Sequence, residues 1–196
     1  MNDLDLRFNS KSKIIFPLFN KRTTTATRRN VMTNNTSALL TKGEGSNLWW
    51  GDILVTFKVT SQDTGGAFSV MEDIVPPHYS TPLHVHTLED ERVYIVDGDF
   101  KFQVGEEIFH ASKGDYVNMP RGLYHKFENI GDTKGVLLVT FSPSGIEDMF
   151  YEMGRPVTDH NTPPPTYTPE EMKNIVAIAL RYGVTIKPPA PRTPEN

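Results

Sequence analysis

The chain has 196 residues, 37% of them hydrophobic, and a formal net charge of −4, which suits one domain with extensions rather than two full domains. Acidic and basic residues are mixed through most of the chain, so we expect a small-molecule partner, with no nucleic acid and no membrane. Cysteine is absent, which excludes disulfides, thiolate metal sites and cysteine nucleophiles and leaves histidine and carboxylate as metal ligands. A reducing cytoplasm is the expected location.

The N-terminal region differs from the rest of the chain, and we predict that residues 1–38 form a disordered basic extension. Residues 1–31 hold seven basic side chains against two aspartates, a net charge of +5. A targeting segment over residues 1–31 is the less favoured alternative, because early aspartates are unusual in a transit peptide and no apolar region follows the twin arginines. A further alternative is that Met32 begins the natural chain.

Residues 39–154 are predicted to form one β-domain, because short β-type runs alternate with turn residues at the spacing of a sandwich or barrel. The predicted strands cover residues 53–60, 67–75, 83–86, 92–96, 100–104, 107–111, 115–119, 125–129 and 135–141. Asp97-Gly98 is the sequence of a two-residue hairpin turn, and further glycines separate later strands. The sheet is therefore expected to be mostly antiparallel.

Two helices are predicted after the strands, each with a recognisable start. Ser144 and Glu147 have the spacing of a capping box, and a glycine follows the apolar face as a stop signal. Thr168 and Glu171 form a second capping box with proline at the first helical position. We expect residues 155–196 to comprise a proline-rich strap, this C-terminal helix and a flexible tail.

The segment HVHTLEDE at residues 84–91 brings two histidines close in sequence. Side chains alternate along a strand, so His84 and His86 point to the same face and can bind one ion. A third histidine, His125, begins another predicted strand after a proline-glycine turn. Phe127 shares the face of His125, so it is the aromatic residue best placed to line a substrate pocket.

Three carboxylates follow the histidine pair, and strand parity separates them. Asp90 points to the opposite face from Glu89 and Glu91. If the chain turns back before Glu91, then Glu91 lies across from His86 on the neighbouring strand, while Glu89 lies in water at the loop tip. We therefore expect Glu91 to join the histidines.

His84, His86, Glu91 and His125 offer three nitrogen ligands and one oxygen ligand. This set suits one divalent transition metal, which can be iron, manganese, nickel, cobalt, copper or zinc. The set does not choose among these metals, and it leaves coordination positions for water, substrate or dioxygen.

These residues resemble the two motifs of the cupin superfamily. The first motif, G-x5-H-x-H-x4-E-x6-G, is met by His84, His86, Glu91 and Gly98, with His78 in place of its leading glycine. The second, G-x5-P-x-G-x2-H-x3-N, is met in full by Gly114, Pro120, Gly122, His125 and Asn129. The resemblance implies an all-β cupin fold, a double-stranded β-helix or jelly-roll barrel with C-terminal helices, and it independently selects Glu91 as a metal ligand.

About residues 39–185 also resemble the single-domain cupins grouped with quercetin 2,3-dioxygenases, through the stretches GEGSNLWWGD, DTGGAFSVMED, HVHTLEDE, SPSGIEDMF and TPEEM. This resemblance implies a metal-dependent dioxygenase that cleaves a flavonol or a related enolisable aromatic hydroxyl compound with O2. The substrate would bind the metal through a deprotonated oxygen, and Glu91 would accept the proton as the catalytic residue. The same ligands would also serve a non-oxidative cupin isomerase, cyclase or lyase, or a metal-dependent small-molecule binding protein. A homodimer is expected from the resemblance.

The remaining histidines and carboxylates near the motifs are not expected to bind the metal. His78, His110 and His160 are expected in loops or at the surface, although His78 is close enough in sequence to line the mouth of the site. Glu89 and Asp90 are expected to form a solvated acidic rim.

Overall fold

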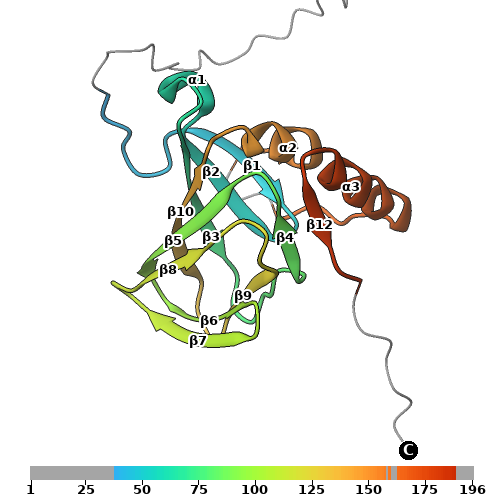
Figure 1. Ribbon diagram of the computed structural model, residues 1–196. Coiled ribbons are helices and arrows are strands. Elements are labelled where there is room, and N and C mark those ends of the chain that lie inside the picture. Colours follow the sequence, from blue (N-terminus) through green and yellow to red (C-terminus); the bar gives the residue numbers. More distant parts are fainter. Residues whose placement is uncertain (1–37, 158, 160–162, 189–196) are drawn as a thin grey trace, which may run out of the picture.

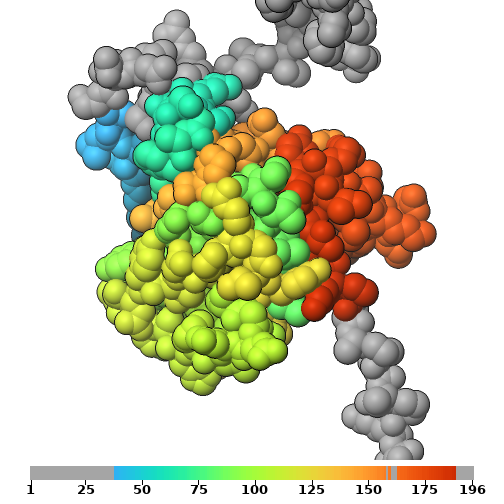
Figure 2. All heavy atoms as spheres, viewed as in Figure 1, coloured from blue at the N-terminus to red at the C-terminus, as the bar shows by residue number. Residues whose placement is uncertain are grey.

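The computed structural model describes residues 38–157, 159 and 163–188. Apart from Ala38, the predicted basic extension lies outside the described residues, and so do His160 and residues 189–196 of the predicted tail. The described strands form two sheets around an apolar interior, and two neighbouring helices lie along one side (Figure 1; Figure 2 shows the same view with all heavy atoms). None of the helices in the described part of the chain has the length and apolar character that crossing a bilayer requires.

The two sheets contain antiparallel neighbours throughout. The larger sheet consists, in spatial order, of β11 (Arg155–Pro156), β1 (Ser46–Trp50), β2 (Ile53–Val59), β3 (Ser69–Val75), β10 (Gly135–Ser142), β5 (Asp90–Asp97) and β8 (Tyr116–Met119). The smaller sheet consists of β12 (Val184–Ile186), β4 (His84–His86), β9 (His125–Asn129), β6 (Asp99–Val104) and β7 (Glu107–Ser112). The predicted antiparallel, jelly-roll-like all-β fold is therefore confirmed.

The sheets do not close into a barrel, so that part of the fold prediction is wrong. From β3 to β6 the chain changes sheet at each step: β4 and β6 lie in the smaller sheet, whereas β3 and β5 lie in the larger sheet. Asp97-Gly98 therefore does not form the predicted hairpin. It turns the chain from one sheet to the other, with Gly98 at a φ of 98°. A Cβ added to Gly98 would lie 2.9 Å from the Cα of Gly135, so this corner requires glycine.

Buried and exposed residues alternate along the strands, and the buried residues form the interior. In β3 and β10 every second residue is buried, as expected where one face of a sheet packs on a core. The fully buried side chains include Phe100, Phe102, Phe141, Ile95 and Leu137, and burying each such side chain stabilises the fold by roughly 1.5–3 kcal/mol. All nine predicted strands are present. The short elements β1, β11, β12 and α1 (Ser61–Thr64) were not predicted, because they offer too few residues to establish a period.

The two longer helices differ in how they begin. In α3 (Pro169–Arg181) the Thr168 hydroxyl accepts a hydrogen bond from the Glu171 N–H and the Glu171 carboxylate accepts one from the Thr168 N–H, which confirms the second capping box. In α2 (Ile146–Met153) the N-cap residue is Gly145, so the predicted Ser144 box is wrong. Glu147 is buried and instead accepts hydrogen bonds from the backbone N–H groups of Gly145 and Ser61, which ties α2 to the segment after β2.

Candidate metal centre

Four predicted site residues, His84, His86, Glu91 and His125, meet between the two sheets. One possible ligand atom from each residue lies within 4.8 Å of those of the others, and all four side chains are buried. His84 on β4 is the register partner of His125 on β9. Glu91 comes from β5 in the opposite sheet, so the hairpin by which we expected it to face His86 does not exist. Strand parity is enough to predict that Glu91 points inward. Side chains alternate along β5, and those of Glu91, Val93 and Ile95 point to the interior.

Backbone carbonyls orient two of the three imidazoles. The Nδ1 atom of His84 lies 2.8 Å from the Pro82 carbonyl oxygen, and the Nδ1 atom of His125 lies 2.9 Å from the Leu123 carbonyl oxygen. A carbonyl can only accept, so each Nδ1 carries a hydrogen and donates it. This leaves Nε2 as the nitrogen that each ring can offer to an ion, an arrangement found around many protein-bound metals.

Glu91 and His125 form a buried ion pair. The Nε2 atom of His125 lies 3.1 Å from Oε2 of Glu91, and both ring nitrogens of His125 then act as donors, which requires the charged imidazolium. Burial lowers the pKa of His125, but the hydrogen bond to Glu91, the negative charge of Glu91 and the hydrogen bond to the Leu123 carbonyl together outweigh burial and raise the pKa overall. Burial likewise raises the pKa of Glu91, but the bond from His125 and the charges of the histidines outweigh it and hold the pKa at about 2. A metal ion held by Nε2 of His125 would take the place of the proton on that nitrogen.

His84 and His86 are neutral around pH 7. Burial lowers the pKa of His84 and lowers that of His86 to about 3. The Nε2 atom of His86 lies 3.4 Å from Oε2 of Glu91. Both rings can therefore donate a lone pair to an ion without first losing a proton.

The two other carboxylates of HVHTLEDE occupy different environments, and only one lies near the surface. Asp90 accepts hydrogen bonds from the backbone and the guanidinium group of Arg121, and these bonds lower its pKa. Glu89 is only 4% exposed, so its prediction as part of a solvated rim is wrong. It lies in the short connection from β4 to β5, and its Oε2 is 3.9 Å from Nδ1 of His86. Neither of these two atoms has a hydrogen-bond partner, and burial raises the pKa of Glu89 to about 7.

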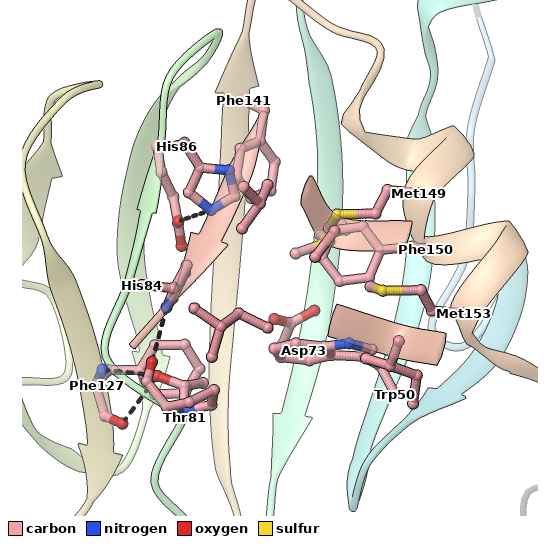
Figure 3. A pocket seen from close by; sticks show the side chains of 17 residues that line it. Trp50, Asp73, Thr81, His84, His86, Phe127, Phe141, Met149, Phe150 and Met153 are labelled. Atoms are coloured by element: carbon pink, nitrogen blue, oxygen red, sulfur yellow. Dashed lines mark hydrogen bonds and ion pairs between the residues drawn. The ribbon is translucent and has the colours of Figure 1, made fainter. Parts of the chain in front are cut away.

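An apolar pocket opens onto the histidines (Figure 3). Its apolar walls come from both sheets and from the helices α2 and α3, and are formed by Trp50, Met71, Phe127, Phe141, Met149, Phe150, Met153, Ile175, Ala179, Val184 and Ile186. Its polar side chains are Asp73, Thr81, His84, His86 and Glu91. Phe127 lines the pocket as predicted. The volume that water can occupy in the pocket is about 40 Å³, enough for a few water molecules. A larger ligand therefore requires flexible wall residues such as Met149 and Met153 to move.

Motif residues outside the cluster shape the loops around it. His78 takes the place of the motif glycine in a left-handed conformation, with a φ of 58°, and histidine is among the residue types that tolerate this region. Its exposed ring lies 3.3 Å from Asp132 rather than in the pocket wall. The backbone N–H of Gly122 donates to the carbonyl of His86. The fully buried Asn129 side chain bonds four backbone groups and so fixes the turn after β9.

Two buried acids at the site, Asp73 and Glu89, were not predicted. Asp73 had a readable signal, because in SVMEDIV it shares the inward parity of Met71 and Val75. A charged residue on the buried face of an alternating strand is an exception that points to function. Glu89 shares the parity of Glu91, but its position before β5 favours a solvated loop tip, and this second argument gave the wrong expectation. His110 lies on the exposed face of β7, away from the cluster.

These side chains fit a divalent transition metal by the chemistry of their donors. Three imidazoles and one carboxylate converge, two of the rings are fixed by second hydrogen bonds, and the opposite side of the cluster faces a pocket. Such a mixed nitrogen and oxygen set suits ions from manganese to zinc.

Comparison with known proteins agrees with this architecture. Residues 71–141 match the family model of the cupin domain. Quercetin 2,3-dioxygenase from Bacillus subtilis (strain 168) is 28% identical over 137 residues, which cover 69% of this chain and 40% of that protein. Quercetin 2,3-dioxygenase from Aspergillus japonicus is 33% identical over 113 residues, which cover 54% of this chain and 32% of that protein. The match thus spans well under half the length of either relative.

Among solved structures, that of KdgF from Halomonas sp. is similar, with a TM-score of 0.52 and 17% sequence identity over 58% of this chain and 99% of that chain. At this identity the similarity shows the shared fold alone.

Proposed function

The chain is a member of the cupin superfamily that resembles the quercetin 2,3-dioxygenases, and from this premise we propose that it is a metal-dependent dioxygenase. Its substrate would be a flavonol or another aromatic compound with an enolisable hydroxyl group. The observation that carries the proposal is the convergence of His84, His86, Glu91 and His125 on one side of an apolar pocket. The four side chains would hold one divalent metal.

A bound divalent ion would supply Lewis-acid charge that lowers the pKa of a substrate hydroxyl, and a redox-active ion would also supply electrons for reaction with dioxygen. Glu91 is the residue that we assign to the proton. Its carboxylate is buried and ionised, and it lies on the side of the site that faces the pocket. A hydroxyl group that enters from the pocket can therefore transfer its proton to a Glu91 oxygen without the help of bulk water.

The other side chains position the reactants. The carbonyls of Pro82 and Leu123 hold the rings of His84 and His125 in one orientation. The apolar walls would contact the faces of an aromatic substrate, and Phe127 and Phe141 are placed for ring contacts. These walls also exclude water, which strengthens the electrostatic interactions in the site.

The experiment is to measure dioxygen uptake by the metal-loaded protein with a panel of flavonols, catechols and diketones, together with product masses. We expect uptake and an oxygenated product with at least one compound, and loss of both in His125→Ala. The matched control is His110→Ala, which changes an exposed histidine on β7. Absence of uptake with every compound, despite a filled metal site, would refute the proposal. Product formation without oxygen consumption would identify a non-oxidative enzyme instead.

A further inference from the structure

Asp73 is a buried carboxyl group in the pocket wall that the proposed chemistry does not use. Its residue is 3% exposed, and Oδ1 has no hydrogen-bond partner. Within the described part of the chain, no ion pair or hydrogen bond of the Asp73 side chain is formed. Figure 3 shows it among the side chains that line the pocket.

The surroundings of Asp73 on its own sheet are apolar. Its register partners on the neighbouring strands, Val55 and Leu137, are fully buried. Met71 and Val75, which share its face on β3, are also buried. The two strands paired with β3 therefore offer no partner. Glu91 lies on β5 of the same sheet, but a second carboxylate repels Asp73 rather than pairing with it, and the histidines of the pocket lie across the interior on β4. Burial raises the pKa of Asp73 well above its ordinary value.

An unpaired buried carboxyl group is costly, so its presence calls for a reason. Leaving a buried polar group without a partner costs about 1–3 kcal/mol. Leucine has the same branching as aspartate and would fill the space without that cost. Proteins tolerate such local destabilisation mainly where function requires it.

We propose that Asp73 is a substrate-binding residue that pairs with a second hydroxyl group of the substrate while the reacting group lies at His84, His86 and Glu91. A hydroxyl group both donates and accepts hydrogen bonds, so it can pair with the side chain in either protonation state. This inference deepens the proposed function and depends on it, because it takes the four-residue cluster as the place where the reacting end binds. It narrows the substrate class to aromatic compounds that carry a second hydroxyl group.

The test compares two small ligands that differ only in this hydroxyl group. Kojic acid and allomaltol share a metal-chelating hydroxypyranone, and kojic acid carries a hydroxymethyl group where allomaltol has a methyl group. Their dissociation constants are measured with the zinc-loaded protein, because zinc is redox-inert and no turnover intervenes. We expect the native protein to prefer kojic acid by about tenfold, which corresponds to about 1.4 kcal/mol.

Two variants separate the hydroxyl contact from general effects of substitution. Asp73→Asn keeps a donor and an acceptor and should retain the preference for kojic acid. Asp73→Leu should bind the two ligands equally while holding the same amount of zinc, and its metal-free form should melt at a higher temperature than the native protein.

Three results would overturn the inference. These are equal binding of the two ligands by the native protein (including no binding of either), an unchanged preference in Asp73→Leu, and loss of zinc from Asp73→Leu. If Asp73→Leu does not fold, loss of the preference in a folded Asp73→Asn also counts against it. None of these measurements involves dioxygen, so the failure of this inference and the failure of the proposed dioxygenase are distinguishable.

Discussion

Glu89 should make the stability of the metal-free protein fall as the pH rises, and its replacement by glutamine should remove this fall. The side chain is only 6% exposed, and burial raises its pKa from 4.5 to about 7. The folded protein therefore keeps the Glu89 proton over a range in which the unfolded chain has already lost it. Because folding then takes up a proton, stability decreases with rising pH between 4.5 and about 7.

The size of this loss of stability follows from the difference between the pKa values of Glu89 in the folded and unfolded protein. At about 1.36 kcal/mol per pH unit, a rise from 4.5 to about 7 corresponds to about 3 kcal/mol. We expect the free energy of unfolding of the native protein, relative to that of Glu89→Gln, to decrease by up to this amount between pH 4.5 and pH 8. The native protein and the variant share every other titrating group, so the difference isolates Glu89.

The assay is urea unfolding of the chelator-treated protein at several pH values, followed by circular dichroism. Asp90→Asn is the matched control, because hydrogen bonds from Arg121 lower the pKa of Asp90. A depressed pKa has the opposite sign: the contribution of Asp90 is present above its ordinary pKa of 3.8 and is lost as the pH falls. A constant difference between the native protein and Glu89→Gln from pH 4.5 to pH 8 would refute the reasoning and indicate that Glu89 ionises as it does in water.

Three further predictions address the metal, the helix caps and the corner between the sheets. His125→Ala should lower zinc affinity, measured by competition with a chelator, by at least roughly 100-fold, because loss of an outer hydrogen-bond partner of a metal ligand alone costs about 10–100-fold. His110→Ala should not change the affinity in the same assay. Thr168→Ala should lower the free energy of unfolding by about 1 kcal/mol, whereas Ser144→Ala should not lower it in the same urea titration, because the Ser144 hydroxyl has no partner. Gly98→Ala should lower the melting temperature measured by calorimetry. The new Cβ would lie 2.9 Å from a backbone atom, and the residue must keep a positive φ. An unchanged melting temperature would contradict this prediction.

The strands could be predicted from the sequence because alternation reports which side of a strand is buried, whichever neighbour the strand has. This explains how the inward direction of Glu91 was predicted although its assumed partner strand was wrong. The assignment of strands to sheets depends on contacts between distant segments, and these have no local signal. Asp97-Gly98 is suitable both for a hairpin and for a corner between sheets, and its sequence alone does not distinguish the two.

The environments of the carboxylates at the site could be predicted only in part. Asp90 was placed on the correct side by parity, but its partner Arg121 lies on a segment 31 residues later. The burial of Glu89 depends on how the short connection after His86 crosses between the sheets. Local pattern contains no information about such a crossing, and a charged residue next to a turn is most often solvated.

The strand that carries His84 and His86 has consequences for the order of folding. It has three residues and a single register pair with β9, whereas β12, near the end of the described chain, pairs with all three of its residues. Contacts between segments so far apart in sequence form late, because a long loop must close first. During synthesis, the two histidines would therefore become fixed only after β12 has left the ribosome and docked on β4. A nascent chain without β12 would lack a rigid site to capture a metal ion, so we expect metal to be acquired after β12 has been synthesised.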